Sequence, residues 1–201
     1  MIGVIPAEVA RAEDPRSKES TVSGDLATHE LREEHELILE VLDLMAELAS
    51  EDAGGFDASR LATHQPAFSE FLESFADRFH HAKEEALLFT HARPFLVHCN
   101  PIEQMLYEHA LMRELRVAMD EAHRARDLAA LTEACAELCQ TLAQHIFKEN
   151  HVLYPMVEQL LSDEARAALG EGYDEVRKRS GGPALRERFE AMRDALRDEL
   201  G

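Results

Sequence analysis

The sequence predicts an all-α protein, built as an antiparallel up-down-up-down four-helix bundle with an additional C-terminal helix. Apolar residues recur at steps of three and four along four long segments, the period of a helix that buries one side. The connections between these segments are short, which favours antiparallel packing of neighbouring helices. No segment alternates apolar and polar residues in the period of a strand. With 201 residues, 45% of them hydrophobic, the chain is long enough for one packed core.

We expect three parts along the chain: an N-terminal arm at residues 1–25, the bundle at 26–162 and a C-terminal helical extension at 163–201. The arm is polar, carries Pro6, Pro15 and Gly24, and has no sustained period, so it is predicted to be flexible. Its short apolar start matches neither a signal peptide nor a membrane span, and we expect a cytoplasmic protein.

The first bundle helix is expected to begin after Thr28, a residue type that caps helix N-termini, and to stop near Gly54 and Gly55. Its apolar side contains Leu31, Ile38, Leu42, Met45 and Ala49. His35 falls on that same side, so we expect it to be buried.

The second helix is expected to start near Pro66 and to end before Pro94, which cannot continue a helix. Its apolar side leads into the stretch FHHAKEEALLF at residues 79–89, which sets His80 and His81 one turn ahead of Glu84 and Glu85. The segment PFLVHCNP between Pro94 and Pro101 is predicted to be a loop.

The third helix is expected to run from Pro101 to near Ala125 and the fourth to start around Asp127. One side of the third helix is formed by Ile102, Met105, His109 and Met112, so a single histidine lies among apolar residues there. The fourth carries a histidine and a glutamate on the clearest apolar stripe of the chain: Cys135, Leu138, Leu142, His145, Glu149, Val152 and Met156. Pro155 is predicted to kink the last turn of this helix.

A last amphipathic helix is expected after Gly181, Gly182 and Pro183. One of its sides is apolar, with Leu185, Phe189, Met192, Leu196 and Leu200. That side could pack against the bundle or against a second subunit, which would give a homodimer.

The charge and cysteine content exclude several classes of protein. A formal net charge of −19 repels nucleic-acid phosphates and anionic lipids, so neither nucleic acid nor a membrane is expected as a partner. Three cysteines without a CxxC spacing indicate neither a disulfide framework nor a zinc knuckle. Cys135 and Cys139 lie one helical turn apart and are interpreted as core residues.

Histidine followed four residues later by glutamate places both side chains on one face of a helix, where they can bind the same metal ion. Four such pairs occur, at His29/Glu33, His80/Glu84, His81/Glu85 and His145/Glu149. Composition alone would produce one or two of them. His145 and Glu149 differ from chance matches because they interrupt an apolar stripe, where an unpaired carboxylate would cost several kcal/mol. Because all four helices place a histidine on the inner face, we predict a metal centre, with two metals for two pairs.

Four sequence segments resemble the hemerythrin-like HHE cation-binding family: EEHELIL around His35, HHAKEEALLF, MLYEHALMREL around His109, and HIFKENHVLYP. The resemblance covers roughly residues 28–160. It implies a hemerythrin-like four-helix bundle that holds two non-haem iron ions, with histidines from all four helices and two bridging carboxylates. The metal ligands that it implies are His35, His80, Glu84, His109, His145 and Glu149.

One ligand of the hemerythrins proper is missing, because Arg113 stands where a second histidine would follow His109 by one turn. His81, a carboxylate such as Glu34 or Glu108, or water could replace it. An α-helix turns by about 100° per residue, so one turn cannot aim His80, His81, Glu84 and Glu85 at the same centre. Whether His81 is a ligand or makes an outer contact stays open, and so does the role of Glu85. His98 and His151 are weaker candidates. Imidazole and carboxylate donors suit iron, manganese or zinc, and the resemblance favours iron.

The function expected from these features is that of a di-iron protein that binds or reacts with O2, NO or peroxide, for binding, sensing or detoxification. Whether it is an enzyme stays open, and Tyr107, Tyr154 and Arg113 are the candidate proton donors near such a site. The alternative is an iron-responsive homeostasis or regulatory module whose stability depends on metal occupancy. A structural bundle without metal is the third hypothesis.

Overall fold

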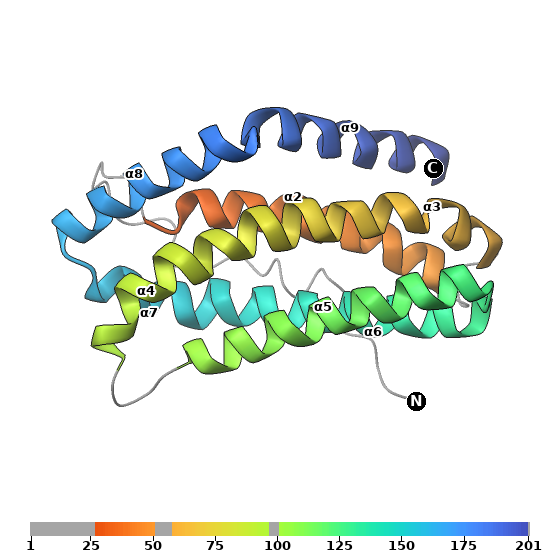
Figure 1. Cartoon of the computed structure of the whole chain (residues 1–201), viewed down its shortest axis with the longest axis horizontal. Helices are drawn as coiled ribbons and strands as arrows, with labels where there is room; N and C mark the ends of the chain where they lie inside the picture. Colours follow the sequence, from red (N-terminus) through yellow and green to blue (C-terminus); the bar gives the residue numbers. More distant parts are fainter. Residues whose placement is uncertain (1–26, 51–57, 97–100, 201) are drawn as a thin grey trace.

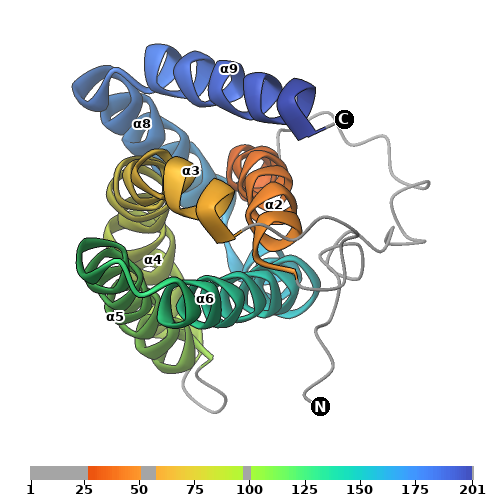
Figure 2. The same ribbon diagram turned by 90° about the vertical axis from the view of Figure 1, so that its right-hand side faces the viewer.

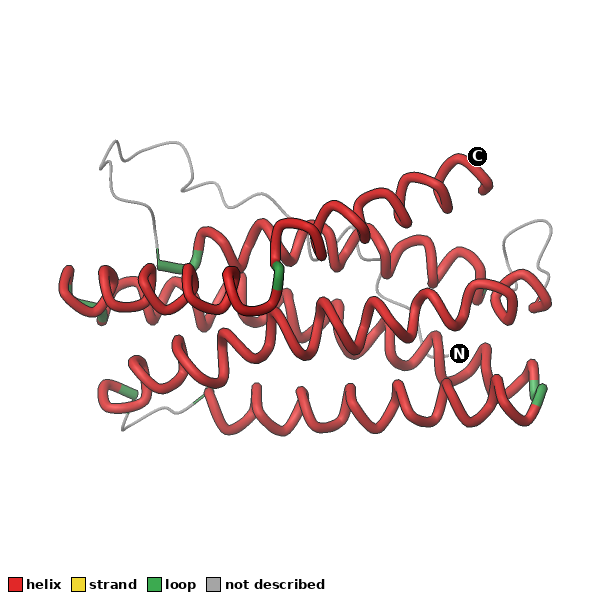
Figure 3. Tube along the Cα trace, turned by 45° about the horizontal axis from the view of Figure 1, so that its top comes forward, coloured by secondary structure: helices red, strands yellow, loops and turns green. Residues whose placement is uncertain are grey.

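The computed structural model describes residues 27–50, 58–96 and 101–200 of the chain. All regular structure in these ranges is helical, and no strand occurs among them (Figure 3). The all-α prediction is therefore confirmed for the part of the chain that the structure describes. The predicted arm at residues 1–25 lies outside these ranges, as do Gly54, Gly55, His98 and Cys99.

Four helical rods form the bundle, and two of them change helix type part-way along. The first rod is α2 (His29–Ala49) and the third is α5 (Ile102–Ala125). The second rod contains α3 (Ala58–Phe71), the π-helical segments η1 (Leu72–His81) and η2 (Glu84–Leu88), α4 (Phe89–Ala92) and the 3-10 turn η3 (Arg93–Phe95). The fourth contains α6 (Leu128–Lys148), the π-helical segment η4 (Glu149–Leu153) and α7 (Tyr154–Leu160).

Two more helices, α8 (Asp163–Ser180) and α9 (Gly182–Leu200), lie against the bundle. They cover α2 and α3 on the side that faces away from α5 and α6 (Figures 1 and 2). Gly181 joins them with φ of 64°, a left-handed conformation that glycine adopts without strain. Phe189 of α9 is buried against Phe71 and Phe75, with ring centroids 5.1 and 6.1 Å apart. The apolar side of α9 therefore packs against the chain's own bundle, and the homodimer stays a prediction.

The apolar core consists of two clusters separated by a level of polar side chains. One cluster fills the end of the bundle around Phe68, Phe75 and Leu138, and the other fills the end around Leu31, Phe89 and Tyr154. Every rod passes from one cluster to the other at a histidine or a His/Glu pair. The buried polar residues at this level include His35, His80, His81, Glu84, His109, His145 and Glu149. The fold thus brings the six ligands that the resemblance implies, together with His81, to one height in the bundle.

The start of the second rod differs from the prediction. α3 begins at Ala58, eight residues before Pro66, which lies inside the helix. Interior proline removes one backbone hydrogen bond, so the segment before it must be held by other contacts. Leu61 is fully buried, and the Gln65 side-chain amide donates to Asp120 Oδ1 at 2.6 Å. Tertiary packing thus keeps the first turns helical.

Candidate metal centre

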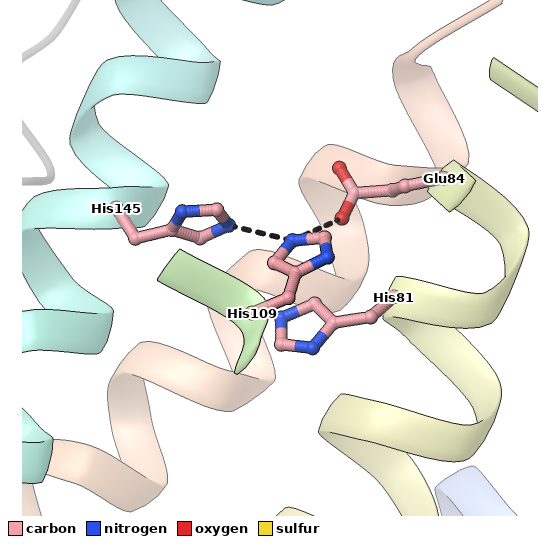
Figure 4. Close-up of side chains that lie close together, drawn as sticks. All are labelled: His81, Glu84, His109 and His145. Atoms are coloured by element: carbon pink, nitrogen blue, oxygen red, sulfur yellow. Dashed lines mark hydrogen bonds and ion pairs between the residues drawn. The ribbon is translucent and has the colours of Figure 1, made fainter. Parts of the chain in front are cut away.

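Three histidines and one glutamate from three rods converge at the polar level. His81, Glu84, His109 and His145 each place a donor atom within 4.8 Å of the others, and all four are buried (Figure 4). Nε2 of His109 lies 3.0 Å from Nε2 of His145 and 3.5 Å from Oε2 of Glu84. Ligands at right angles on an ion with bonds of about 2.1 Å lie about 3 Å apart. The spacing is therefore that of donors able to share one metal ion.

A second group lies beside the first and shares one residue with it. His35, His80, Glu84 and Glu149 also place donor atoms within 4.8 Å of one another. Nε2 of His35 is 3.3 Å from Oε2 of Glu149, and Nε2 of His80 is 3.6 Å from Oε2 of Glu84. The same Glu149 oxygen is 3.2 Å from Nε2 of His145, which belongs to the first group. Both carboxylates thus lie between the two sets of histidines.

The outer nitrogen of four of these histidines is held by a hydrogen-bond acceptor. The pairs are His35 Nδ1 with Asn150 Oδ1 at 3.0 Å, His80 Nδ1 with Glu34 Oε2 at 2.9 Å, His109 Nδ1 with Glu85 Oε1 at 2.8 Å, and His145 Nδ1 with Glu108 Oε2 at 2.9 Å. A carboxylate or amide oxygen accepts from each ring, so Nδ1 carries a ring proton. Nε2 of each ring then points toward the centre, where its neutral form offers a lone pair to a metal ion.

A family model for the hemerythrin HHE cation-binding domain matches residues 26–157, more than half of the chain. The chain belongs to the hemerythrin HHE cation-binding family. No curated protein and no solved structure matches it in the same comparisons. The matched residues include both candidate metal groups and end before α8 begins at Asp163.

π-Helical turns aim the HHE ligands of the second rod. A π-helix closes its hydrogen bonds over five residues instead of four, so each residue turns the helix by less than the 100° of an α-helix. His80 and His81 end η1, and Glu84 begins η2 after the two α-helical residues Ala82 and Lys83. Adjacent histidines therefore reach the same centre, His80 in one group and His81 in the other. The sequence left the role of His81 open, and the folded chain places its ring in the first group.

Each glutamate that accepts from an HHE histidine is in turn paired with a cation. Lys83 contacts Glu34, Arg113 contacts Glu85, and Lys148 contacts Glu108. Lys83 is the buried one of the three, with 0% of its side chain exposed, whereas Arg113 and Lys148 are each 40% exposed. Lys83 also donates to Glu30 Oε1 at 2.7 Å, and Glu30 pairs with Arg177 of α8. A chain of charged contacts thus joins His80 to the helix outside the bundle.

The polar level fits a bound metal because it leaves buried donors without hydrogen bonds. Within the described residues these include Nε2 of His80, both ring nitrogens of His81, Oε2 of Glu84 and both carboxylate oxygens of Glu149. Such groups cost free energy when buried unpaired. Oxygen and imidazole nitrogen are the donor atoms that iron, manganese and zinc accept. A cation at this level would satisfy them together.

Burial and the short distance between the two carboxylates set their protonation in the metal-free protein. Burial and the charge of Glu149 raise the pKa of Glu84 well above its usual range. Burial acts against the charge of Glu149, but His145 and His35 outweigh it and lower its pKa. Burial also acts against His145, but Glu149 and Glu108 raise its pKa to about 9. A proton on His145 therefore takes the place of a metal charge between these ligands at neutral pH.

The candidate replacements for the missing ligand occupy different places. His81 lies within the first group, and Asp77 Oδ1 is 3.7 Å from its Nδ1. Glu34 and Glu108 lie outside the groups, behind His80 and His145. His151 is in neither group, and its Nδ1 is 2.9 Å from the Phe147 carbonyl. The geometry leaves His81 as the residue that can complete the set.

The three candidate proton donors also lie in different places. Tyr107 is 63% exposed and lies on the surface. Tyr154 is buried and donates to Glu84 Oε1 at 2.6 Å, and its oxygen is 3.4 Å from Nε2 of His35. Arg113 donates to Asp77 and Glu85. Of the three candidates, Tyr154 is therefore the one whose hydroxyl contacts residues of the two groups.

Sequence reasoning did not find the outer residues Asn150, Asp77 and Lys83. Asn150 and Lys83 each lie next to a ligand in the chain, where a 3.6-residue period assigns them to another face. A buried lysine beside two glutamates has no composition signal, since charged residues usually face water. Only the contacts in the folded chain reveal these three.

Proposed function

We propose that this chain is a non-haem di-iron protein that binds or reacts with a small molecule such as O2, NO or peroxide. Membership of the HHE family and the two buried His/Glu groups support it. The observation that carries the proposal is the common orientation of His35, His80, His109 and His145, whose Nε2 atoms face one another while acceptors hold Nδ1.

In this proposal, one ion is held by His81, His109 and His145 and the other by His35 and His80. Glu84 and Glu149 are shared between the ions, which lowers the repulsion between two cations. The scaffold is the up-down-up-down bundle, with the C-terminal helices laid on it. When bound, iron supplies the redox chemistry and an exchangeable position for a small ligand.

The chain's own residues hold and screen this centre. The outer carboxylates fix each imidazole ring and increase its basicity. The apolar clusters on both sides exclude water, so electrostatic interactions inside are strong. The Tyr154 hydroxyl donates a hydrogen bond to Glu84 Oε1. Burial raises the pKa of Tyr154 well above its usual range. Tyr154 thus orients Glu84 and stays neutral at physiological pH.

The test is the metal content and absorption spectrum of the purified full chain, with and without O2, NO and peroxide. We expect two irons per chain and ligand-to-iron absorption that changes on adding one of these molecules. His145→Ala should lose iron, while His151→Ala should keep it. A chain that takes up no metal after reconstitution with iron, manganese or zinc would refute the proposal.

A second function, regulation by metal-dependent stability, is supported by the contacts between the centre and α8. The unpaired donors destabilise the metal-free fold, and the His80–Glu34–Lys83–Glu30–Arg177 chain carries the change to α8. Iron uptake without a spectral response to O2, NO or peroxide, together with faster proteolysis of α8 in the metal-free protein, would favour this function.

No nucleic acid or membrane partner is proposed. The net charge of −19 opposes both, and none of the helices in the described ranges has the length and apolarity needed to cross a bilayer.

A further inference from the structure

A small pocket reaches the candidate metal centre from the side of the first group. Its volume is about 20 Å³. Its walls are apolar, formed by Leu72, Ala76, Met112, Leu138 and Leu142. His81 and His109 line its buried end, while Asp77, Arg113 and Arg116 are the partly exposed residues of its lining. The pocket therefore opens to solvent at the charged residues, and the candidate ligands His81 and His109 lie at its buried end.

Arg113 stands one helical turn after His109 on α5, but its charged group is held at the outer end. Nε donates to Asp77 Oδ1 at 2.7 Å and Nη2 donates to Glu85 Oε1 at 2.7 Å. Asp77 lies 3.7 Å from His81 Nδ1, and Glu85 accepts from His109 Nδ1. One arginine thus ties together the two carboxylates that contact the two histidines of the pocket.

The size and walls of the pocket select the kind of molecule that fits. One ordered water needs a cavity of about 10–15 Å³, so a pocket of about 20 Å³ suits one small molecule of about two heavy atoms. The apolar walls offer a hydrogen-bonding ligand few partners. The rim arginines are paired, Arg113 with Asp77 and Glu85 and Arg116 with Asp120, so they attract an anion weakly.

We propose that Arg113 is the gate of a pocket that admits one neutral diatomic molecule, O2 or NO, to the His81–His109–His145 side of the centre. This inference rests on the proposed di-iron function, because the diatomic molecule is taken to reach a metal ion. The pocket itself rests only on the residues that line it. Arg113 determines specificity by closing the entrance and by keeping the rim carboxylates neutralised.

The pocket is tested without metal. Dissolved O2 is paramagnetic and speeds the relaxation of methyl protons that it approaches. In the metal-free chain under O2 pressure we expect a larger effect at the Met112 methyl than at the methyls of Leu48, which has the same 6% exposure and does not line the pocket. Ala76→Phe should remove the difference. Equal relaxation at Met112 and Leu48 would overturn the pocket, whether or not the chain binds iron.

The gate is tested in the iron-loaded chain by stopped flow, with NO as the neutral probe and azide as the anionic one. Arg113→Ala opens the entrance and leaves Asp77 and Glu85 without their cation. NO binding should then become at least about tenfold faster and azide binding slower. Arg193→Ala is the matched control, because it removes a two-carboxylate contact with Glu40 and Asp194 far from the pocket, and should change neither rate.

Equal changes for NO and azide in Arg113→Ala, or an unchanged NO rate at full iron content, would overturn the gate. Circular dichroism and iron content of each variant show whether it has folded and loaded. If Arg113→Ala loses its iron, Arg113→Lys replaces it in the test, because lysine keeps the charge but cannot make the forked contact with both carboxylates. That variant should raise the NO rate and leave the azide rate near its wild-type value. Wild-type chain without iron would contradict the proposed function and leave the O2 relaxation result standing.

Discussion

The Tyr154 hydroxyl donates a hydrogen bond to Oε1 of Glu84 at 2.6 Å, inside the layer that separates the two apolar clusters. The other oxygen of Glu84 faces His80 and His109. Because the two oxygens of Glu84 are thus given different partners, Tyr154 fixes which one is turned toward the candidate ions. The π-helical segment η4 ends at Leu153, directly before Tyr154, and α7 then begins with Pro155 near its start.

Tyr154→Phe removes this hydrogen bond and keeps the ring. We expect the free energy of unfolding of the metal-free protein to fall by about 1–2 kcal/mol, because a buried oxygen of Glu84 loses its partner. Chemical denaturation followed by circular dichroism measures it. Tyr107→Phe is the control, since that side chain is exposed and should leave stability unchanged. Equal stabilities of the two variants would contradict the role of Tyr154.

Lys83→Met should be more damaging than Lys148→Met. Both lysines pair with a glutamate that holds a histidine, but Lys83 is fully buried and Lys148 is 40% exposed. Burial raises the pKa of Glu34 to about 7 even with Lys83 beside it. Removing one partner of a buried ion pair costs about 3–5 kcal/mol, whereas an exposed pair contributes about 0–1 kcal/mol. Denaturation curves of both variants give the comparison, and a larger loss in Lys148→Met would refute it.

The Lys83 change should also weaken the centre. Loss of a partner behind a metal-binding histidine lowers metal affinity by about 10–100-fold. Competition with a chelator measures that affinity for both lysine variants. Wild-type affinity in a folded Lys83→Met protein would show that Glu34 holds His80 without help from the lysine.

His81→Ala tests whether the π-helical turn supplies a ligand. We expect the variant to keep the second group and to bind one ion firmly and the other weakly, so that metal per chain falls from two toward one. His151→Ala should keep the full content, because His151 lies in neither group. Metal analysis after gel filtration distinguishes the two. Full content in His81→Ala would mean that another donor or water completes the set.

Metal binding should release protons at neutral pH. In the metal-free protein the pKa of His145 is raised to about 9, and that of Glu84 is raised well above its usual range. At pH 7 His145 is therefore protonated, and a metal ion must displace that proton to use the ring. Isothermal titration in buffers of different ionisation enthalpy should report net release of protons on metal binding.

The sign of the pH dependence follows from the same two groups. Because protons compete with the metal, affinity should rise from pH 7 toward pH 9, the range in which His145 loses its proton in the metal-free protein. Affinity that falls as the pH rises over this range would contradict the assignment of His145.

Much of the centre is predictable from sequence because an α-helix has a fixed period. His35, His109, His145 and Glu149 stand at steps of three or four from apolar neighbours, and all four are buried in the fold. On the second rod, where η1 and η2 are π-helical and the period is longer, that rule left His81 open, and the structure places its ring in the first group. The start at Pro66 was predicted from the preference of proline for the first helical turn, whereas packing of Leu61 and Gln65 extends α3 back to Ala58.

The sequence by itself determined that the chain is helical, that the HHE family signature is present and which histidines face inward. The spacing of apolar residues along the chain is enough for that, because it sets which side of each helix is buried. The tertiary structure alone decided how Glu34, Glu85 and Glu108 hold the histidines, that Lys83 is buried, and that Arg113 joins Asp77 and Glu85 at a pocket. These contacts join residues at least 24 positions apart, such as His109 and Glu85, so packing between rods creates them and no local pattern encodes them.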